Sequence, residues 1–222
     1  MDGIIVVDKP SGMTSHDVVA IIRRKLKQKR VGHAGTLDPL ATGVLVILVG
    51  ASTRLFDKFV AFDKGYGATL KLGLKTHSAD IQGDVLMERP FEGITREMVE
   101  ASFKKFTGTI DQVPPMVSAV KHKGERLYKL ARQGISVDRP ARQVRIDVLD
   151  LLSFEPPLVA FHLDCSKGTY VRQVAEDVGE DLGCGACITD IRRTKVGPFT
   201  IQEAVRLDDV NETHLRAWRY GV

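Results

Sequence analysis

The stretch GHAGTLDPLATGVL, from Gly32 to Leu45, combines a single carboxylate with residues that favour a tight turn. Asp38 is the only acid in this stretch, and His33 lies five residues before it. Pro39 fixes its own φ angle and biases Asp38 away from the helical region, so the turn can aim the carboxylate into a cleft. A carboxylate held in this way could act as a nucleophile. The simpler alternatives are an ordinary Asp-Pro turn and a hydrogen-bonded turn histidine.

Two further side chains could assist this carboxylate. Arg172 lies in the first turns of an expected helix after the segment SKGTY, and a guanidinium beside a carboxylate keeps the acid ionised and oriented. Tyr66 begins an expected strand on its apolar side and would bring a phenol to the site. The simpler alternatives are a surface cation for Arg172 and a core tyrosine for Tyr66.

No sequence motif for a nucleotide, a metal or a redox cofactor accompanies these residues. The chain has no GxxxxGK[ST], no dinucleotide-binding glycine triplet, no HExxH and no GxSxG. Cys184 and Cys187 form a CxxC, but zinc would need two further ligands at a suitable spacing. Small residues that fill a helix-to-strand turn explain this pair better than a redox site does. We therefore expect no cofactor and no metal.

Alternation and helical spacing predict the elements that must position these side chains. We expect strands at 4–7, 66–72, 144–148 and 159–165, and helices after Thr14 and in the segments TREMVEASFKKFTG and GTYVRQVAEDVGEDLG. Thr14 and Asp17 have capping-box spacing at the start of the first helix. Residues 44–49 form either a buried strand or the end of a helix, and periodicity does not decide between the two. Helices and strands mix without a regular order, which predicts an α+β fold.

The basic residues are distributed unevenly, which points to a polyanionic partner. The net charge of +4 is small, but residues 23–30 read RRKLKQKR. A second basic region spans residues 121–145 and contains Tyr128 among its cations. Cation clusters with an interleaved aromatic ring are typical of surfaces that bind the backbone of RNA or DNA. One such run alone would more simply be a solvated helix face.

Length and composition are those of an ordinary globular protein. The chain has 222 residues, of which 43% are hydrophobic and 27% charged, enough to bury a sizeable core. No apolar run approaches the ~20 residues that cross a bilayer. The opening MDGIIVVDKP lacks the features of a signal peptide. We expect a cytoplasmic protein that acts as a monomer and has no membrane partner.

The stretch GHAGTLDPLATGVL resembles the catalytic motif of the bacterial tRNA pseudouridine-55 synthases, the TruB family. Four more segments resemble motifs of this family in the same order: GIIVVDKPSGMTSHDVV, KGYGATLKLGLKTHSADIQGD, QVPPMVSAVKHKGERLYKLARQGISVDRPAR and CSKGTYVRQVAEDVGEDLGCGACITDIRRTKVGPF. The resemblance covers nearly the whole chain. It implies a pseudouridine synthase fold with a central, mostly antiparallel mixed sheet flanked by helices. It also implies one catalytic domain, residues 1–222, with a projecting thumb loop at about 113–142.

The resemblance implies isomerisation of uridine 55 in the T-loop of tRNA. By position, Asp38 becomes the nucleophile on a flipped-out base, Arg172 its salt-bridge partner, and Tyr66 the tyrosine that stacks on the base and serves in proton removal from C5. His33 would help to hold the flipped nucleotide, and Lys9, with the proline after it, would support the tyrosine. The residues expected to contact RNA are His33, Lys9, Arg23, Arg24, Lys121, Lys123, Arg126, Arg132 and Arg142.

The chain departs from the family pattern at two places. Ala34 stands where the commonest form of the motif has threonine. Only 23 residues follow Phe199, where the family usually continues into a small RNA-binding domain, so we expect no separate C-terminal domain. Two alternatives stay open: a tRNA chaperone without activity, and a pseudouridine synthase acting on another RNA, such as rRNA or a guide-directed target. The intact catalytic set argues against the first, and the long thumb favours a tRNA T-arm.

Overall fold

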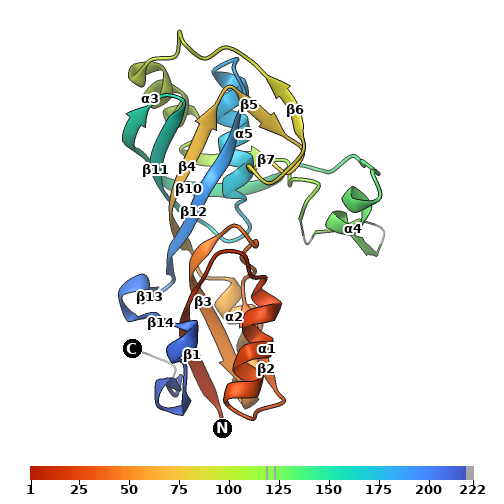
Figure 1. Cartoon of the computed structure of the whole chain (residues 1–222), viewed down its shortest axis with the longest axis vertical. Helices are drawn as coiled ribbons and strands as arrows, with labels where there is room; N and C mark the ends of the chain where they lie inside the picture. The colour runs from red at the N-terminus through yellow and green to blue at the C-terminus, as the bar shows by residue number, and fades with distance from the viewer. Residues whose placement is uncertain (119, 123, 219–222) are drawn as a thin grey trace. The chain divides into compact units, whose positions relative to one another are not determined.

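The computed structural model describes residues 1–118, 120–122 and 124–218, and the chain divides into two compact units (Figure 1). Unit 1 comprises Met1–Gly67 and Ile191–Val222, and unit 2 comprises Ala68–Asp190. Strands β4 (Lys64–Leu72) and β12 (Ala186–Val196) each contribute residues to both units. The expected α+β class is confirmed, because helices are mixed with strands whose described pairings are mostly antiparallel.

Unit 1 is built around the buried strand β3. Its elements are β1 (Gly3–Lys9), α1 (Ser15–Lys25), β2 (Val31–Ala34), β3 (Thr42–Val49), the 3-10 helix η1 (Gly50–Leu55), α2 (Phe56–Val60), β13 (Phe199–Thr200), β14 (Val205–Arg206) and three short 3-10 helices, η2 (Ile201–Glu203), η3 (Leu207–Asp209) and η4 (Glu212–His214). Strand β1 runs antiparallel to the whole of β3. Strand β2 pairs with the second half of β3, and the end of β12 runs parallel to its first residues, with Arg192 opposite Thr42 and Arg193 opposite Gly43.

Local sequence explains two of these elements. Thr14 caps α1, and its side chain and that of Asp17 form the expected capping box. Residues 44–49, which the sequence left undecided, belong to β3 and are buried throughout. A strand paired along both edges and buried on both faces has no polar side to alternate with, so its sequence shows no period of two.

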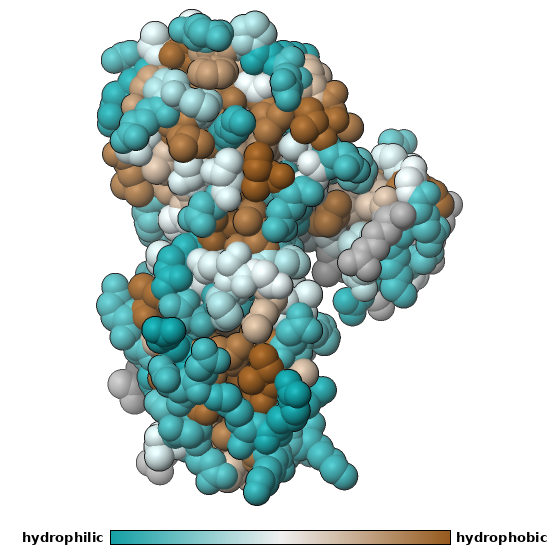
Figure 2. Space-filling view, in the orientation of Figure 1, coloured by the Kyte–Doolittle hydropathy of each residue, from teal (hydrophilic) through white to brown (hydrophobic). Residues whose placement is uncertain are grey.

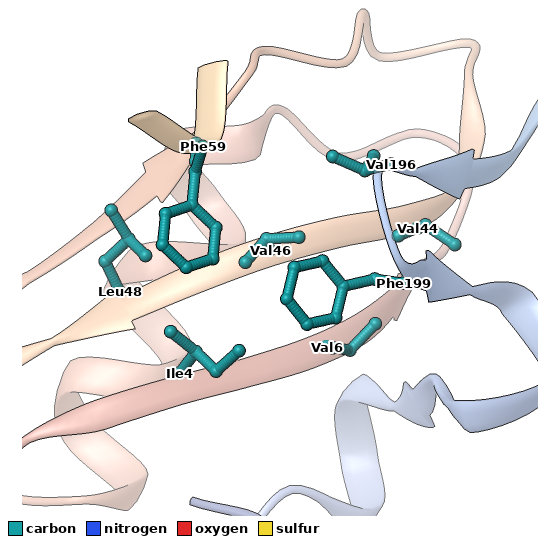
Figure 3. Packing of buried hydrophobic residues seen from close by; sticks show 9 residues of the cluster. Ile4, Val6, Val44, Val46, Leu48, Phe59, Val196 and Phe199 are labelled. Atoms are coloured by element: carbon teal, nitrogen blue, oxygen red, sulfur yellow. The ribbon is translucent and has the colours of Figure 1, made fainter. Parts of the chain in front are cut away.

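One hydrophobic cluster packs β13 against the first strands of unit 1. Figure 3 shows Phe59 of α2 and Phe199 of β13 lying over Val46 of β3 and beside Ile4 of β1. The rings of Phe59 and Phe199 are stacked, with centroids 5.8 Å apart and planes 10° from parallel. Because β13 is paired with the end of β12, this packing also fixes the last residues of β12 within the unit.

Unit 2 contains the remaining predicted elements. They are most of β4, β5 (Leu74–Thr76), β6 (Val85–Glu88), α3 (Arg96–Lys105), β7 (Gly108–Gln112), β8 (Lys121–His122), β9 (Glu125–Arg126), α4 (Leu127–Arg132), β10 (Arg142–Glu155), β11 (Leu158–Cys165), α5 (Val171–Asp181) and the start of β12. The strand order is β12-β4-β11-β10-β7, with β10 antiparallel to both of its neighbours. The strands expected at 66–72, 144–148 and 159–165 and both later helices are confirmed.

Residues 113–142, the predicted thumb, carry the hairpin β8–β9 and helix α4. Figure 1 shows α4 and its flanking loops standing clear of the strands of unit 2. The segment folds on itself, because the backbone N–H of Leu127 donates to Val120 at 2.8 Å and that of Tyr128 donates to Ser118 at 3.0 Å. Its visible face is mostly hydrophilic (Figure 2). Among the described residues, no helix has both the length and the apolar composition of a membrane span.

Candidate active site

Asp38 lies in the loop between β2 and β3, and unit 1 anchors the backbone of this loop on both sides of it. The Ser15 hydroxyl donates to the Leu37 carbonyl at 3.1 Å and accepts from the Leu37 N–H at 2.9 Å. The Ala41 N–H donates to the Asp38 carbonyl at 3.1 Å. Leu37 and Ala41 are buried, whereas Asp38 is half-buried. The turn therefore presents one carboxylate from a fixed backbone.

Lys9 supports this loop from inside unit 1. Its ammonium group donates to the carbonyls of Pro10 at 2.8 Å, Met13 at 2.6 Å and Pro39 at 3.4 Å, and its side chain is fully buried. Burial is the main cause that lowers the pKa of Lys9 to about 8, while the negative charge of Asp38 opposes the shift. A side chain with no exposed surface has no room for an RNA contact. The burial of Lys9 therefore speaks against the expected RNA contact, and its hydrogen bonds place it as a support of the Asp38 loop. Its expected support of Tyr66 stays a prediction.

His33 lies in β2 and is half-buried. Its ring packs edge-on against His16, with centroids 5.2 Å apart. Burial first, and then the nearby positive charges of His16 and Arg193, lower the pKa of His33 to about 4. His33 is therefore neutral at pH 7 and would contact a base or a sugar as an uncharged imidazole, without attracting phosphate by charge.

Tyr66 lies in β4 and is 8% exposed. Ala68, Leu70 and Leu72 are buried on the same face of the strand, as the alternation predicted. Two residues before it, the Lys64 ammonium donates to the carbonyl of Val60 at 2.7 Å and also to that of Phe62. The Tyr66 phenol therefore lies on a strand whose first residue, Lys64, is hydrogen-bonded to the preceding turn.

Arg172 occupies the first turn of α5 in unit 2, as predicted. The side chain of the buried Gln112 holds the residue before the helix: its Oε1 accepts from the Tyr170 N–H at 2.9 Å, and its Nε2 donates to the Tyr170 carbonyl at 3.2 Å. A positive charge is disfavoured at a helix N-terminus. The arginine is nevertheless only 4% exposed, so other groups must compensate its charge.

Asp80 supplies that compensation, and the sequence analysis missed it. Its Oδ2 lies 3.6 Å from Nη1 of Arg172, and both side chains are buried. Its Oδ1 accepts from the hydroxyl of Ser78 at 2.7 Å and from the N–H of Gln82 at 3.1 Å. Nη1 of Arg172 also donates to the Ser78 carbonyl at 2.6 Å, and Nη2 to the Val117 carbonyl at 2.9 Å. Arg172 thus links the loop at Ser78 and Asp80 to Val117, near the start of the thumb.

Asp38 and Tyr66 belong to unit 1, and Arg172 belongs to unit 2. The pairing of Arg172 with Asp38 therefore stays a prediction. Asp80 lies in HSADIQGD, inside the tyrosine-bearing segment of the sequence, and no local pattern there indicates a pairing with Arg172, which is 92 residues further along the chain.

The residues expected to contact RNA lie on several elements. Arg23 and Arg24 are exposed on α1, although Nη2 of Arg23 donates to the Val31 carbonyl at 2.8 Å. Arg126, in β9, and Arg142, at the start of β10, are exposed. Lys121 and Arg132 lie in β8 and α4, and Lys123 lies outside the described residues. The exposed Arg23, Arg24, Arg126 and Arg142 suit phosphate contacts, and the RNA-binding assignment stays a prediction.

The CxxC pair fills space as expected. Cys184 and Cys187 are both buried and free, and burial raises the pKa of the Cys187 thiol to about 11, with the charge of Asp80 as the second cause. A buried thiol with a raised pKa is poorly reactive.

Comparison with known proteins gives consistent matches. Residues 23–171 match the model of the N-terminal domain of TruB family pseudouridylate synthases, and residues 172–219 match that of the tRNA pseudouridylate synthase B C-terminal domain. The chain is 45% identical to the tRNA pseudouridine synthase B of Pseudomonas paraeruginosa, covering 96% of this chain and 70% of the relative. It is 47% identical to those of Clostridium tetani, covering 97% and 75%, and Thermobifida fusca, covering 94% and 74%.

Two solved structures share the fold. A chain of a Cbf5–Nop10–Gar1 complex aligns with a TM-score of 0.73 and 32% identity over 93% of this chain. A chain of an H/ACA ribonucleoprotein bound to a substrate RNA containing 2′-deoxyuridine aligns with a TM-score of 0.69 and 27% identity, also over 93%. This chain spans 53% and 51% of those chains, respectively.

Proposed function

Because this chain belongs to the TruB family of pseudouridylate synthases, we propose that it converts a uridine of tRNA into pseudouridine, with Asp38 as the nucleophile. One observation carries the proposal. The half-buried Asp38 carboxylate projects from a loop whose backbone is held by hydrogen bonds at Leu37, before it, and at Ala41, after it. The family match, at residues 23–171, includes this loop.

The chemistry needs only what these residues offer. The glycosidic bond between N1 and C1′ breaks, the uracil turns, and a bond forms between C5 and C1′, while the proton on C5 is removed and N1 takes up a proton. The product is therefore an isomer of the substrate, and the reaction consumes no energy source. Attack by the Asp38 carboxylate divides one difficult substitution into two easier steps. A stacked uridine must first be flipped out, at a cost of a few kcal/mol, and phosphate contacts offset that cost.

We assign the neighbouring residues by their family positions. Tyr66 stacks on the flipped base and takes part in removing the C5 proton, and His33 contacts the flipped nucleotide as a neutral ring. Arg172 pairs with Asp38 in the reacting complex, and Asp80 holds the Arg172 guanidinium in orientation for that role. The buried Asp80–Arg172 pair supports this assignment, because it leaves the guanidinium fixed before RNA arrives.

The substrate that we propose is tRNA, modified at uridine 55 of the T-arm by a monomer in the cytoplasm. The relatives named for tRNA are 45–47% identical to this chain, whereas the two ribonucleoprotein chains are 27–32% identical. The basic helix α1 and the thumb, residues 113–142, offer exposed arginines to an RNA stem.

The proposal is tested by incubating the purified protein with unmodified tRNA and mapping pseudouridine by position. We expect one modified position, in the T-loop, and modification of an isolated T-arm stem-loop within about tenfold of whole tRNA in kcat/KM, a difference of ~1.4 kcal/mol. Pseudouridine at another position, or only in another RNA, would contradict the substrate. Faster tRNA annealing without any pseudouridine would instead support the chaperone alternative.

A further inference from the structure

A second buried cation, Arg193, also contacts the Asp38 loop. It lies in β12, far from Lys9 in the sequence. Its side chain is 2% exposed. Nε donates to the Val44 carbonyl at 2.7 Å, Nη2 to the Gly35 carbonyl at 3.0 Å, and Nη1 to the Thr36 carbonyl at 3.5 Å. Every partner of this guanidinium that the structure describes is therefore a backbone carbonyl at one end or the other of the loop.

The positions of these carbonyls make Arg193 a bridge across the loop. Gly35 and Thr36 come just before Asp38, and Val44 comes after it in β3. Fixing both ends of a short segment restricts the conformations of everything between them. Lys9 adds a third point, the Pro39 carbonyl directly after Asp38.

The backbone of Arg193 is also in contact with the loop. A Cβ at Gly43, where φ is +97°, would lie 2.2 Å from the Arg193 carbonyl oxygen. Only glycine therefore allows the strand and the loop to approach this closely. Arg193 cannot move away from the loop without breaking the pairing between β12 and β3.

A buried cation is expensive, so its presence needs a reason. Desolvating a guanidinium costs several kcal/mol unless its donors are satisfied. Two buried cations against one loop also repel each other: the charge of Arg193 adds to burial in lowering the pKa of Lys9. An apolar side chain of similar size would fill the same space without this cost. An apolar side chain would lack the planar guanidinium group, whose N–H donors hold three carbonyls at defined positions.

We propose that Arg193 is a positioning residue for pseudouridine formation, which holds residues 35–44, the Asp38 loop and the first residues of β3, in the one geometry that aims Asp38 at the flipped uridine. This inference rests on the proposed function. Arg193 is 2% exposed and acts through the backbone carbonyls of Gly35, Thr36 and Val44. A misplacement of the reacting carboxylate by about 1 Å can cost about 100-fold in rate, so a loosened loop should be seen in turnover.

The test compares Arg193→Lys and Arg193→Gln with the matched control Arg192→Gln. Arg192 is adjacent in β12, and its half-exposed side chain is ion-paired with Asp8 at 2.7 Å. Its Nη1 also donates to the Thr42 hydroxyl at 3.4 Å, so the control removes a contact to the same segment but none of the three hydrogen bonds to carbonyls. The single-turnover rate constant at saturating tRNA and the tRNA Kd are measured well below the Tm of each variant, after circular dichroism has confirmed the fold. Lysine keeps the charge but cannot bridge both ends of the loop, and it is the variant expected to fold.

We expect Arg193→Lys to lower the rate constant 10–100-fold and Arg193→Gln to lower it further, with Kd within threefold of wild type. The control should stay within twofold for both. Amide exchange at Ala41, whose N–H donates to the Asp38 carbonyl, should be faster in Arg193→Lys.

Three results would overturn the inference: wild-type rate constants in the folded variants, a loss confined to Kd, or failure of both variants to fold, which would leave Arg193 a purely structural residue. A wild-type protein that makes no pseudouridine would instead refute the proposed function, so the two failures are distinguishable.

Discussion

The buried pair Asp80–Arg172 makes a prediction whose size can be worked from the structure. Asp80→Asn keeps the shape and the Oδ1 acceptor for Ser78 and Gln82 but removes the charge that faces Arg172. At the 3.6 Å separation, an effective dielectric constant of ~20 gives an attraction of roughly 4–5 kcal/mol before desolvation is counted. Removing one partner of a buried pair costs about 3–5 kcal/mol in measured cases. We expect Asp80→Asn to lower the free energy of unfolding by about 3 kcal/mol.

The assay is urea unfolding at pH 7 of wild type, Asp80→Asn, Arg172→Met and the double variant. A loss of about 3 kcal/mol corresponds to a fall in Tm of about 6–12 °C for a chain of this length. The double variant should be less unstable than the sum of the single variants by about 2 kcal/mol, because both single substitutions remove the same attraction between Asp80 and Arg172. The Asp80→Asn protein should also form pseudouridine more slowly, with little change in the Kd for tRNA.

Asp147→Asn is the matched control for this experiment. Asp147 is also in unit 2, and its Oδ1 lies 2.7 Å from Nε of Arg145, but both side chains are largely exposed. An exposed pair contributes about 1 kcal/mol or less. If Asp80→Asn cost no more than Asp147→Asn, or if the Asp80 and Arg172 substitutions added within ~0.5 kcal/mol, the account of a fixed, charge-compensated arginine would be refuted.

Three further predictions concern the tyrosine, the histidine and the thumb. Tyr66→Phe should keep stacking but lose proton transfer, so the single-turnover rate should fall about 10²–10⁴-fold at unchanged Kd; near-normal turnover would exclude the phenol. The folded-state pKa of His33 is about 4 against 6.5 in an unfolded chain, so the unfolded chain binds the proton first. Stability should therefore be lost as pH falls from about 6.5 to 4, and less so in His33→Gln, as urea unfolding at pH 7 and pH 5 will show. Residues 113–142 should exchange amide hydrogens more slowly with tRNA bound; equal exchange would contradict an RNA-gripping thumb.

Much of the fold could be predicted because local signals were strong. The capping box at Thr14 and Asp17 started α1 where expected, and the alternation from Tyr66 to Leu72 gave β4. Residues 44–49 could not be assigned, because a strand buried on both faces shows a continuous apolar run. The hairpin β5–β6 was also missed, since Val85 and Leu86 are exposed and give no apolar alternation.

The candidate site was predicted less completely, for a different reason. Local sequence made Asp38, Tyr66 and Arg172 candidates with simpler alternatives, and the resemblance of five motifs then gave all three their expected roles. Asp80 and Arg193 were missed because their roles come from contacts with residues distant in sequence. Lys9 was placed only by its position in the resembling first motif, and the structure shows its ammonium group among three backbone carbonyls. Lysine is rarely buried, so no sequence pattern indicated this position.

The central claim is that the Asp38 carboxylate performs the isomerisation, and one measurement tests it most directly: the single-turnover formation of pseudouridine by Asp38→Asn with a saturating excess of protein over unmodified tRNA. Asparagine keeps the size and the turn but cannot act as a carboxylate nucleophile. We predict no pseudouridine above the no-enzyme background, with the Kd for tRNA within a few-fold of wild type, because the exposed cations lie on other elements. Pseudouridine formed by the pure Asn variant at a rate within 100-fold of wild type would contradict the account.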